Sequence, residues 1–236
     1  MTGALGATHL LSMAVIALAG AGAVVLPPRW SEPANRNVAR GLAVLLLGAE
    51  LSWWLFQAVT GGWRGVGGLP LQLCDLTAIV GAAALWTWRP LLAEITWFWG
   101  IGGALQALLT PELPAPFPSW LAFQYYIVHG GAVVAAILLV IGLRRYPRAW
   151  AVPRMILVTG LVAVAIGIVD WTTGADYLFL RSPPPIHSLL SVIGGWPRYP
   201  VLLFLLGVGF LLILDLPFFF VRRIQSAGAR PVKAAP

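Results

Sequence analysis

The chain has 236 residues, of which 59 % are hydrophobic and only 10 % are charged, whereas an ordinary soluble domain has roughly 25 % charged residues. Water cannot solvate so apolar a surface, so the composition excludes a soluble globular protein and indicates a lipid environment. The net charge of +7 does not indicate a nucleic-acid partner, because the basic residues stand beside apolar runs and are not interleaved with exposed aromatic residues.

Seven apolar runs follow one another, each long enough for a membrane span of about 20 residues. Clusters of proline and glycine separate them. We therefore predict an all-α polytopic membrane protein: a bundle of seven transmembrane helices within residues 1–224, followed by a disordered cytoplasmic tail, residues 225–236. The predicted spans are Thr8–Leu26, Val38–Ala58, Pro70–Trp88, Leu91–Thr110, Ser119–Leu143, Pro153–Trp171 and Tyr199–Val221.

The distribution of basic residues predicts the orientation. With the N-terminus outside and the C-terminus inside, 12 of the 15 Lys and Arg residues fall in cytoplasmic segments, as the positive-inside rule requires. Only Arg64, Arg181 and Arg198 lie outside. No Lys or Arg precedes Arg29, so the first run lacks the charged start of a signal peptide and is read as a permanent helix. We expect the chain to cross a cell membrane several times, and we expect that membrane to be a bacterial plasma membrane.

Small residues within two runs predict close helix packing, because they let backbones approach. They are Gly100, Gly102 and Gly103 in the fourth run and Gly160 and Gly167 in the sixth.

Ionisable groups inside spans are costly and therefore mark candidate functional sites. In the predicted topology, one band in the outer half of the membrane contains the thiol, several carboxylates and several amides, which predicts a polar cavity open to the outside. Its members are Gln72, Cys74, Asp75, Gln106, Gln124 and Asp170, with His129 nearby.

The remaining polar residues have other expected roles. Glu50 and Asp215 lie deeper, where hydrogen bonds between helices are an equally good account. Glu94 is expected to form a surface pair with Arg89. His9 and His187 are expected to be solvated near the outer surface.

Cys74 and His129 together suggest nucleophilic chemistry. An imidazole can deprotonate a thiol, and the thiolate can attack a lipid ester to give an acyl-thioester. Asp75 or Asp170 is positioned to orient the imidazole, and Gln72, Gln106 or Gln124 to donate hydrogen bonds to the oxyanion. The competing interpretation is that Cys74, the only cysteine, is a small apolar core residue. No metal-ligand spacing or phosphate-binding loop is present, so no metal or cofactor is predicted.

Four stretches are similar to a known family: Leu69–Leu76, Trp97–Pro111, Phe123–Gly130, which includes Tyr125, and Gly174–Arg181. With them the chain resembles the YwaF-like bacterial membrane proteins, which belong with the eukaryotic transmembrane protein 164. The resemblance implies a seven-helix bundle and a cysteine-dependent acyltransferase that moves fatty acyl chains onto ether lysophospholipids. It places the nucleophile on Cys74 and the base on His129. Tyr125 is a further candidate for a supporting or binding role. Gln72 departs from the bacterial pattern, which commonly has His there.

Two other functions fit the same residues. A transporter or lipid-binding carrier would use Glu50, Asp75, Asp170 and Asp215 to line a path. A non-catalytic partner protein would use its polar residues only for helix association. For the first hypothesis, the expected partner is a membrane phospholipid or lysophospholipid.

Overall fold

The computed structural model describes residues 6–62, 68–183 and 198–228, and within these ranges all regular structure is helical. Two π-helical turns interrupt the pattern, Gly100–Ala104 between α4 and α5, and Leu138–Gly142 at the end of α6. A 3-10 turn, Tyr177–Phe179, follows α7. The α-helices are α1 (Ala7–Val25), α2 (Glu32–Thr60), α3 (Leu73–Thr87), α4 (Pro90–Trp99), α5 (Leu105–Leu109), α6 (Trp120–Ile137), α7 (Ala151–Thr173) and α8 (Arg198–Gly228).

Among the described residues, six helical stretches are long and apolar enough to cross a membrane, so the chain is a helical, multi-pass membrane protein. The third predicted span differs from the rest. Helix α3 has only 15 residues and covers about 22 Å at ~1.5 Å per residue, less than the ~30 Å of a bilayer's hydrocarbon core. The count of seven spans and the orientation of the termini therefore stay predictions.

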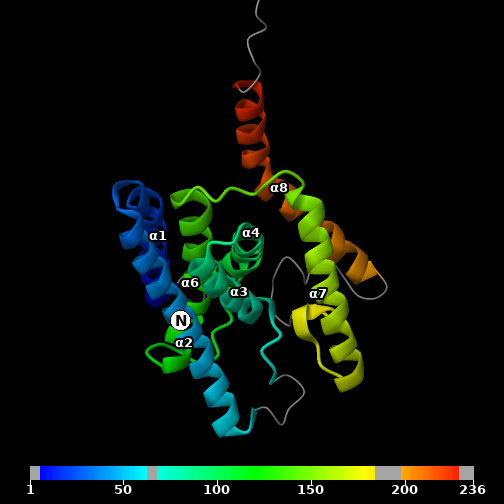
Figure 1. Cartoon of the computed structure of the whole chain (residues 1–236). Coiled ribbons are helices and arrows are strands. Elements are labelled where there is room, and N and C mark those ends of the chain that lie inside the picture. Colours follow the sequence, from blue (N-terminus) through cyan, green and yellow to red (C-terminus); the bar gives the residue numbers. More distant parts are fainter. Residues whose placement is uncertain (1–5, 63–67, 184–197, 229–236) are drawn as a thin grey trace, which may run out of the picture.

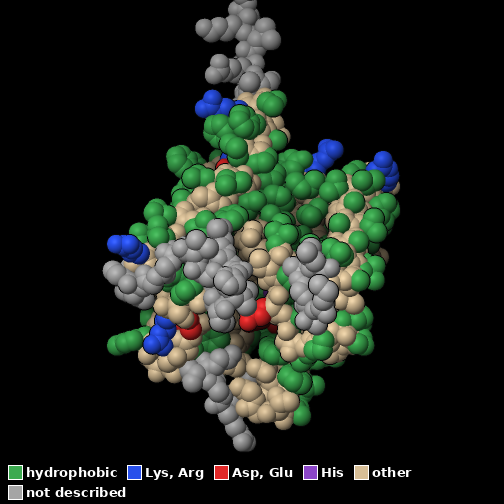
Figure 2. Space-filling model, turned by 180° about the vertical axis from the view of Figure 1, so that it is seen from behind, with side chains coloured by type: hydrophobic (Ala, Val, Ile, Leu, Met, Phe, Trp, Pro, Cys, Tyr) green, Lys and Arg blue, Asp and Glu red, His purple; other side chains and the backbone are tan. Residues whose placement is uncertain are grey.

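Helices α3, α4 and α6 form the centre of the bundle, with α1 and α2 on one side and α7 and α8 on the other (Figure 1). Helix α3 packs against α2, α4 and α6. The outer helices keep apolar faces exposed: Leu157, Leu161, Val164 and Ile168 follow one face of α7 and are each more than half exposed. Figure 2 shows few charged side chains on the visible face, as expected of a surface that contacts lipid.

Close packing at glycine is confirmed in the fourth predicted span. A Cβ added to Gly100 would lie 3.1 Å from the Ala132 carbonyl oxygen of α6, and one added to Gly103 would lie 2.7 Å from the Leu73 side chain of α3. The prediction is wrong for Gly160, around which nothing lies within 4 Å, because α7 is at the periphery. Sequence alone does not say which face of a helix has a neighbour.

The predicted surface pair of Glu94 with Arg89 is wrong. The Glu94 side chain is buried and accepts from the guanidinium groups of Arg148 at 2.9 Å and Arg154 at 2.6 Å. Arg148 Nε and its backbone N–H both reach the same carboxylate oxygen. Hydrogen bonds to that carboxylate raise the pKa of the Arg148 guanidinium above its usual value. The pairs fasten α4 to the segment that leads into α7.

Helix α8 is held by polar contacts near its far end. Asp215 pairs with Arg222 at 2.6 Å, and the Trp97 indole N–H donates to the Leu214 carbonyl at 3.3 Å. The Asp215 pair lies within α8, and Arg222 also donates to the Pro147 carbonyl at 2.9 Å, so among the described residues Asp215 is linked to the neighbouring segment only through Arg222. The helix continues through residues 225–228 of the predicted tail; residues 229–236 and His187 lie outside the described residues.

The contact of α1 with the π-helical turn after α6 is open to a direct test by Gly142→Ala. The new methyl group would meet the Ala23 carbonyl oxygen, so we expect the free energy of unfolding to fall by about 1–3 kcal/mol. Gly160→Ala is the matched control, because it adds the same methyl group to a helix in open space, and we expect no loss there. Thermal midpoints in detergent micelles measure both; equal midpoints would contradict the packing.

The Glu94 network makes a second prediction. Glu94→Gln should lower the free energy of unfolding by about 2 kcal/mol, because it weakens charge-assisted hydrogen bonds to two arginines. Combined with Arg154→Gln, the two losses should fall short of their sum by about 1 kcal/mol. Arg89→Gln serves as the control and should add to Glu94→Gln without coupling. Coupling between Glu94→Gln and Arg89→Gln in the double-mutant cycle would contradict the Glu94 network and support the surface pair expected from the sequence.

Candidate functional site

The start of α3 positions the thiol. Gln72 precedes the helix in extended conformation, with φ −69° and ψ 153°, and its backbone N–H donates to Asp75 Oδ2 at 3.0 Å. A carboxylate in the first turn is favourable, because the free N–H groups there carry the positive end of the helix dipole. Cys74 lies in the same turn, where that dipole also favours a negatively charged sulfur.

Cys74 is half-buried among both apolar and polar neighbours. It packs against the core cluster that contains Ala78 and Val128, and its thiol lies 3.8 Å from Asp75 Oδ1 as a hydrogen-bond donor. Cys74 therefore combines the apolar contacts of a core cysteine with a polar contact to a carboxylate. The arrangement gives the thiol proton an acceptor within reach.

His129 is buried in α6, and its protonation is set by a backbone contact. Its Nδ1 lies 2.8 Å from the Tyr125 carbonyl oxygen; because a carbonyl only accepts, Nδ1 carries the proton of the neutral ring. Nε2 has no hydrogen-bond partner among the described residues and keeps its lone pair free. Neither Asp75 nor Asp170 contacts the imidazole; the Tyr125 carbonyl orients it instead.

Tyr125 connects the two candidate catalytic groups. Its ring stacks beside the His129 ring, with centroids 4.2 Å apart, and it also interacts electrostatically with Cys74. Its hydroxyl donates to the Ala107 carbonyl at 2.6 Å, which fixes the ring between α5 and α6. Among the described residues no hydrogen bond joins the Cys74 thiol to His129 directly.

Gln72 and Asp170 brace the start of α3 from the far side. The Leu178 backbone N–H donates to Gln72 Oε1 at 3.1 Å, and the Tyr177 backbone N–H donates to Asp170 Oδ1 at 3.0 Å. The Tyr177 hydroxyl in turn accepts from the Leu69 backbone N–H at 2.8 Å. Gln72 therefore holds the segment after α7 against the start of α3, and Asp170 holds that segment against the end of α7. The roles expected for them as oxyanion donor and imidazole partner stay predictions.

Gln106 and Gln124 are half-buried, and among the described residues their side chains make no hydrogen bond. Gln106 lies in α5 and Gln124 directly precedes Tyr125 in α6. Their amide groups stay available at this end of the bundle, but no contact assigns a role to either.

Glu50 belongs to the same cluster, which the sequence did not predict. Its side chain is 1 % exposed and interacts electrostatically with Asp75 and Cys74. Neither carboxyl oxygen has a hydrogen-bond partner among the described residues. The inward signal was visible in the spacing, because Glu50, Trp54 and Gln57 share one face of α2; the error was to place Glu50 deeper than the thiol.

His9 was expected to be solvated, and this prediction is wrong. It is buried, with Nδ1 3.0 Å from the Tyr126 hydroxyl, so it joins α1 to α6. Within the described ranges, no group of three or more His, Cys, Asp and Glu side chains is arranged to hold a metal ion.

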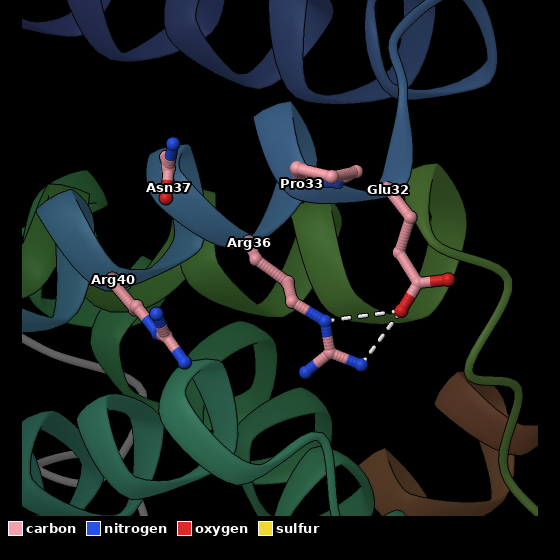
Figure 3. Close-up of a pocket in the computed structure, with 5 residues that line it drawn as sticks. All are labelled: Glu32, Pro33, Arg36, Asn37 and Arg40. Atoms are coloured by element: carbon pink, nitrogen blue, oxygen red, sulfur yellow. Dashed lines mark hydrogen bonds and ion pairs between the residues drawn. The ribbon is translucent and has the colours of Figure 1, made fainter.

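A shallow pocket lies elsewhere, at the start of α2 (Figure 3). It is lined by Glu32, Pro33, Arg36, Asn37 and Arg40. Glu32 and Arg36 pair across it at 2.7 Å, and the Arg36 guanidinium also lies over the Trp88 ring at 4.2 Å. Arg40 is about 15 Å along α2 from Glu50 at ~1.5 Å per residue, so this pocket is separate from the Cys74 cluster.

No solved structure matches the chain. An uncharacterized protein of Treponema pallidum (strain Nichols) is 29 % identical over 221 residues, which cover 90 % of this chain and 88 % of that protein. The model of the TMEM164 family matches residues 4–215. That match includes every helix up to the middle of α8, and the chain therefore belongs to the TMEM164 family.

Proposed function

We propose that this protein is a membrane-embedded acyltransferase that acts on phospholipid acyl esters through an acyl-thioester on Cys74. The observation that carries the proposal is the cluster at the start of α3. There a thiol in a helix's first turn lies beside carboxyl groups, and Tyr125, which interacts electrostatically with that thiol, stacks beside the His129 ring, whose Nε2 is free. Burial of ionisable groups inside a membrane bundle costs free energy, so such groups are candidates for a functional role. The resemblance set out above points to the same chemistry.

In the first half-reaction, His129 Nε2 takes the Cys74 thiol proton, and the thiolate attacks the carbonyl carbon of a phospholipid ester. The tetrahedral intermediate collapses as the bond to the glycerol oxygen breaks. That oxygen takes the proton from the imidazolium, so a lysophospholipid leaves and the acyl group stays on sulfur.

In the second half-reaction, His129 Nε2 deprotonates the hydroxyl of an acceptor lysophospholipid. The resulting alkoxide attacks the thioester, a new ester forms, and the sulfur regains its proton from the imidazolium. If water replaces the acceptor, the same steps give hydrolysis. Apolar surroundings of the cluster, among them Ala78 and Val128, favour transfer because they limit the access of water.

Direct proton transfer requires heavy atoms about 2.6–3.2 Å apart or one intervening water, and such contacts often tighten only when substrate binds. Tyr125 is placed to allow this approach, because it holds the His129 ring through Nδ1 and lies in the electrostatic reach of Cys74. The bacterial plasma membrane is the proposed location, with phospholipid and lysophospholipid as the partners.

The carrier hypothesis has less support. It requires free carboxylates along a path, but Asp215 is paired with Arg222. Asp170 Oδ1 accepts from the Tyr177 backbone N–H, while its Oδ2 has no partner among the described residues. Two of the four groups are thus engaged in structural contacts. The two that remain, Glu50 and Asp75, lie beside Cys74.

The proposal predicts a trapped intermediate. Purified protein given a fluorescent diacylphospholipid in mixed micelles should acquire label that neutral hydroxylamine removes, as expected of a thioester. Because the chain has one cysteine, Cys74→Ala should abolish this label. His129→Ala should slow its formation by about 100-fold or more, the usual contribution of a general base.

Thermal midpoints of both variants provide the control for folding. Cys74→Ala removes only a sulfur atom and should melt close to the wild type. Hydroxylamine-sensitive label, or lipid remodelling, that persists in Cys74→Ala would exclude the proposed function.

A further inference from the structure

Two buried polar groups on α2 have no partner. They are the Glu50 carboxyl, with both oxygens unbonded, and the Trp54 indole Nε1–H, one helical turn further along. The indole lies against the carboxyl, yet without hydrogen-bond geometry between them. Native proteins rarely bury such groups unpaired, and each exception calls for a physical reason. The Glu50 carboxyl also interacts electrostatically with Cys74.

The surroundings of Glu50 determine its charge. Its ionisable neighbours are Asp75 and Cys74, both acids, and no Arg, Lys or His pairs with it among the described residues. An unpaired carboxylate in an apolar interior is far less stable than the neutral acid. Asp75 differs, because it accepts the Gln72 backbone N–H at the start of α3. Asp75 is therefore the anion of the two and Glu50 the neutral acid, whose O–H is a donor.

We propose that Glu50 O–H and Trp54 Nε1–H form the oxyanion site of the acyl transfer at Cys74. This inference rests on the proposed function. A carboxylic acid kept neutral in an apolar site is a known kind of oxyanion donor. The two donors are already buried on one face of one helix, and donors fixed before reaction stabilise developing charge best.

The chemistry requires no proton from either donor. When the Cys74 thiolate attacks the ester carbonyl carbon, the electron pair of the C=O π bond moves to oxygen, which both donors then stabilise. On collapse the C=O bond reforms, and the bond to the glycerol oxygen breaks. The thiol proton, carried by His129, goes to that oxygen. Glu50 and Trp54 end as they began.

The amides expected to fill this role are placed less well. Gln72 is only half-buried, and because its Oε1 accepts from the Leu178 backbone N–H, its amide group is held against the segment after α7. Gln106 and Gln124 are only half-buried, so water competes for their N–H groups. The atoms of Glu50 and Trp54 are both buried and unpaired, which is what an oxyanion site needs before substrate arrives.

Two reactions of the same thiol provide the test. Acylation of Cys74 by a fluorescent diacylphosphatidylcholine passes through an oxyanion, whereas alkylation by iodoacetamide does not. Trp54→Phe and Glu50→Leu each remove a donor and should slow acylation by about 100-fold. Glu50→Gln keeps an N–H in place and should stay within about threefold of the wild type. Alkylation should stay within about threefold in all three.

Trp53→Phe is the matched control, because the Trp53 ring stacks on Phe56 at 5.7 Å and Trp54, not Trp53, interacts with the Glu50 carboxyl. It should leave both reactions unchanged. An equal loss in Trp53→Phe and Trp54→Phe would overturn the oxyanion site. Loss of acylation in Glu50→Gln as deep as in Glu50→Leu would also overturn it, because Glu50 would then act as a carboxylate.

The wild type separates this inference from the proposed function. A wild-type thiol that alkylates but is never acylated refutes the acyltransferase and the oxyanion site with it. A wild-type thiol that is acylated, with Trp54→Phe and Glu50→Leu as fast as wild type, refutes the oxyanion site alone. Thermal midpoints identify a variant that fails to fold; Glu50→Gln and Trp54→Phe then still decide the question if Glu50→Leu is lost.

Discussion

The structure depends on how helix α3 begins. A helix leaves its first N–H groups without partners, and inside a membrane bundle no bulk water satisfies polar backbone. Side chains of the protein satisfy these groups instead. The Asp75 carboxylate accepts a hydrogen bond from the Gln72 N–H, and the Tyr177 hydroxyl accepts one from the Leu69 N–H. These contacts satisfy the start of a short central helix of 15 residues, whose sides pack against α2, α4 and α6.

The same requirement explains why distant parts of the chain meet. Tyr177 and Leu178 follow α7, more than 100 positions after the residues that they contact, and both bond to the segment before α3. Asp170 in turn fixes the Tyr177 backbone. The polar groups of this turn thus satisfy the start of α3 while leaving the thiol of Cys74 facing the opposite neighbours, Asp75, Glu50 and Tyr125. One constraint on backbone hydrogen bonds therefore positions the candidate nucleophile.

The fold class followed from composition and from the length of the apolar runs, because a bilayer sets both. Membership of the family was equally visible in the ordered motifs. The pairing of individual polar residues was not. Glu94 stands five residues after Arg89, yet it bonds to Arg148 and Arg154. The packing of α4 against the loop before α7 and the first turn of α7 determines which cations reach this buried carboxylate. Gly160 resembles Gly100 in sequence but lacks a neighbour, because periodicity gives a face and not its partner.

Glu50 shows the same limit at the candidate site. Its face of α2 was read correctly as inward, and its depth was read from the predicted spans. Depth in a bundle also depends on where the opposing helix begins. Helix α3 starts at Leu73, three residues after the start of the predicted span at Pro70, and its first-turn residues Cys74 and Asp75 both interact electrostatically with Glu50.

Buried polar groups are paired at one end of the bundle and partly unpaired at the other. Near the start of α4, Glu94 has two cations, and in α8 Asp215 has Arg222. Around Cys74, Glu50 and the Trp54 indole have no partner, and His129 uses one nitrogen and leaves the other open. Unpaired buried groups lower stability by about 1–3 kcal/mol each. A functional role of the Glu50 carboxyl and the Trp54 indole would explain why they remain unpaired despite this cost. Groups that must bind developing charge cannot already be bonded to the protein.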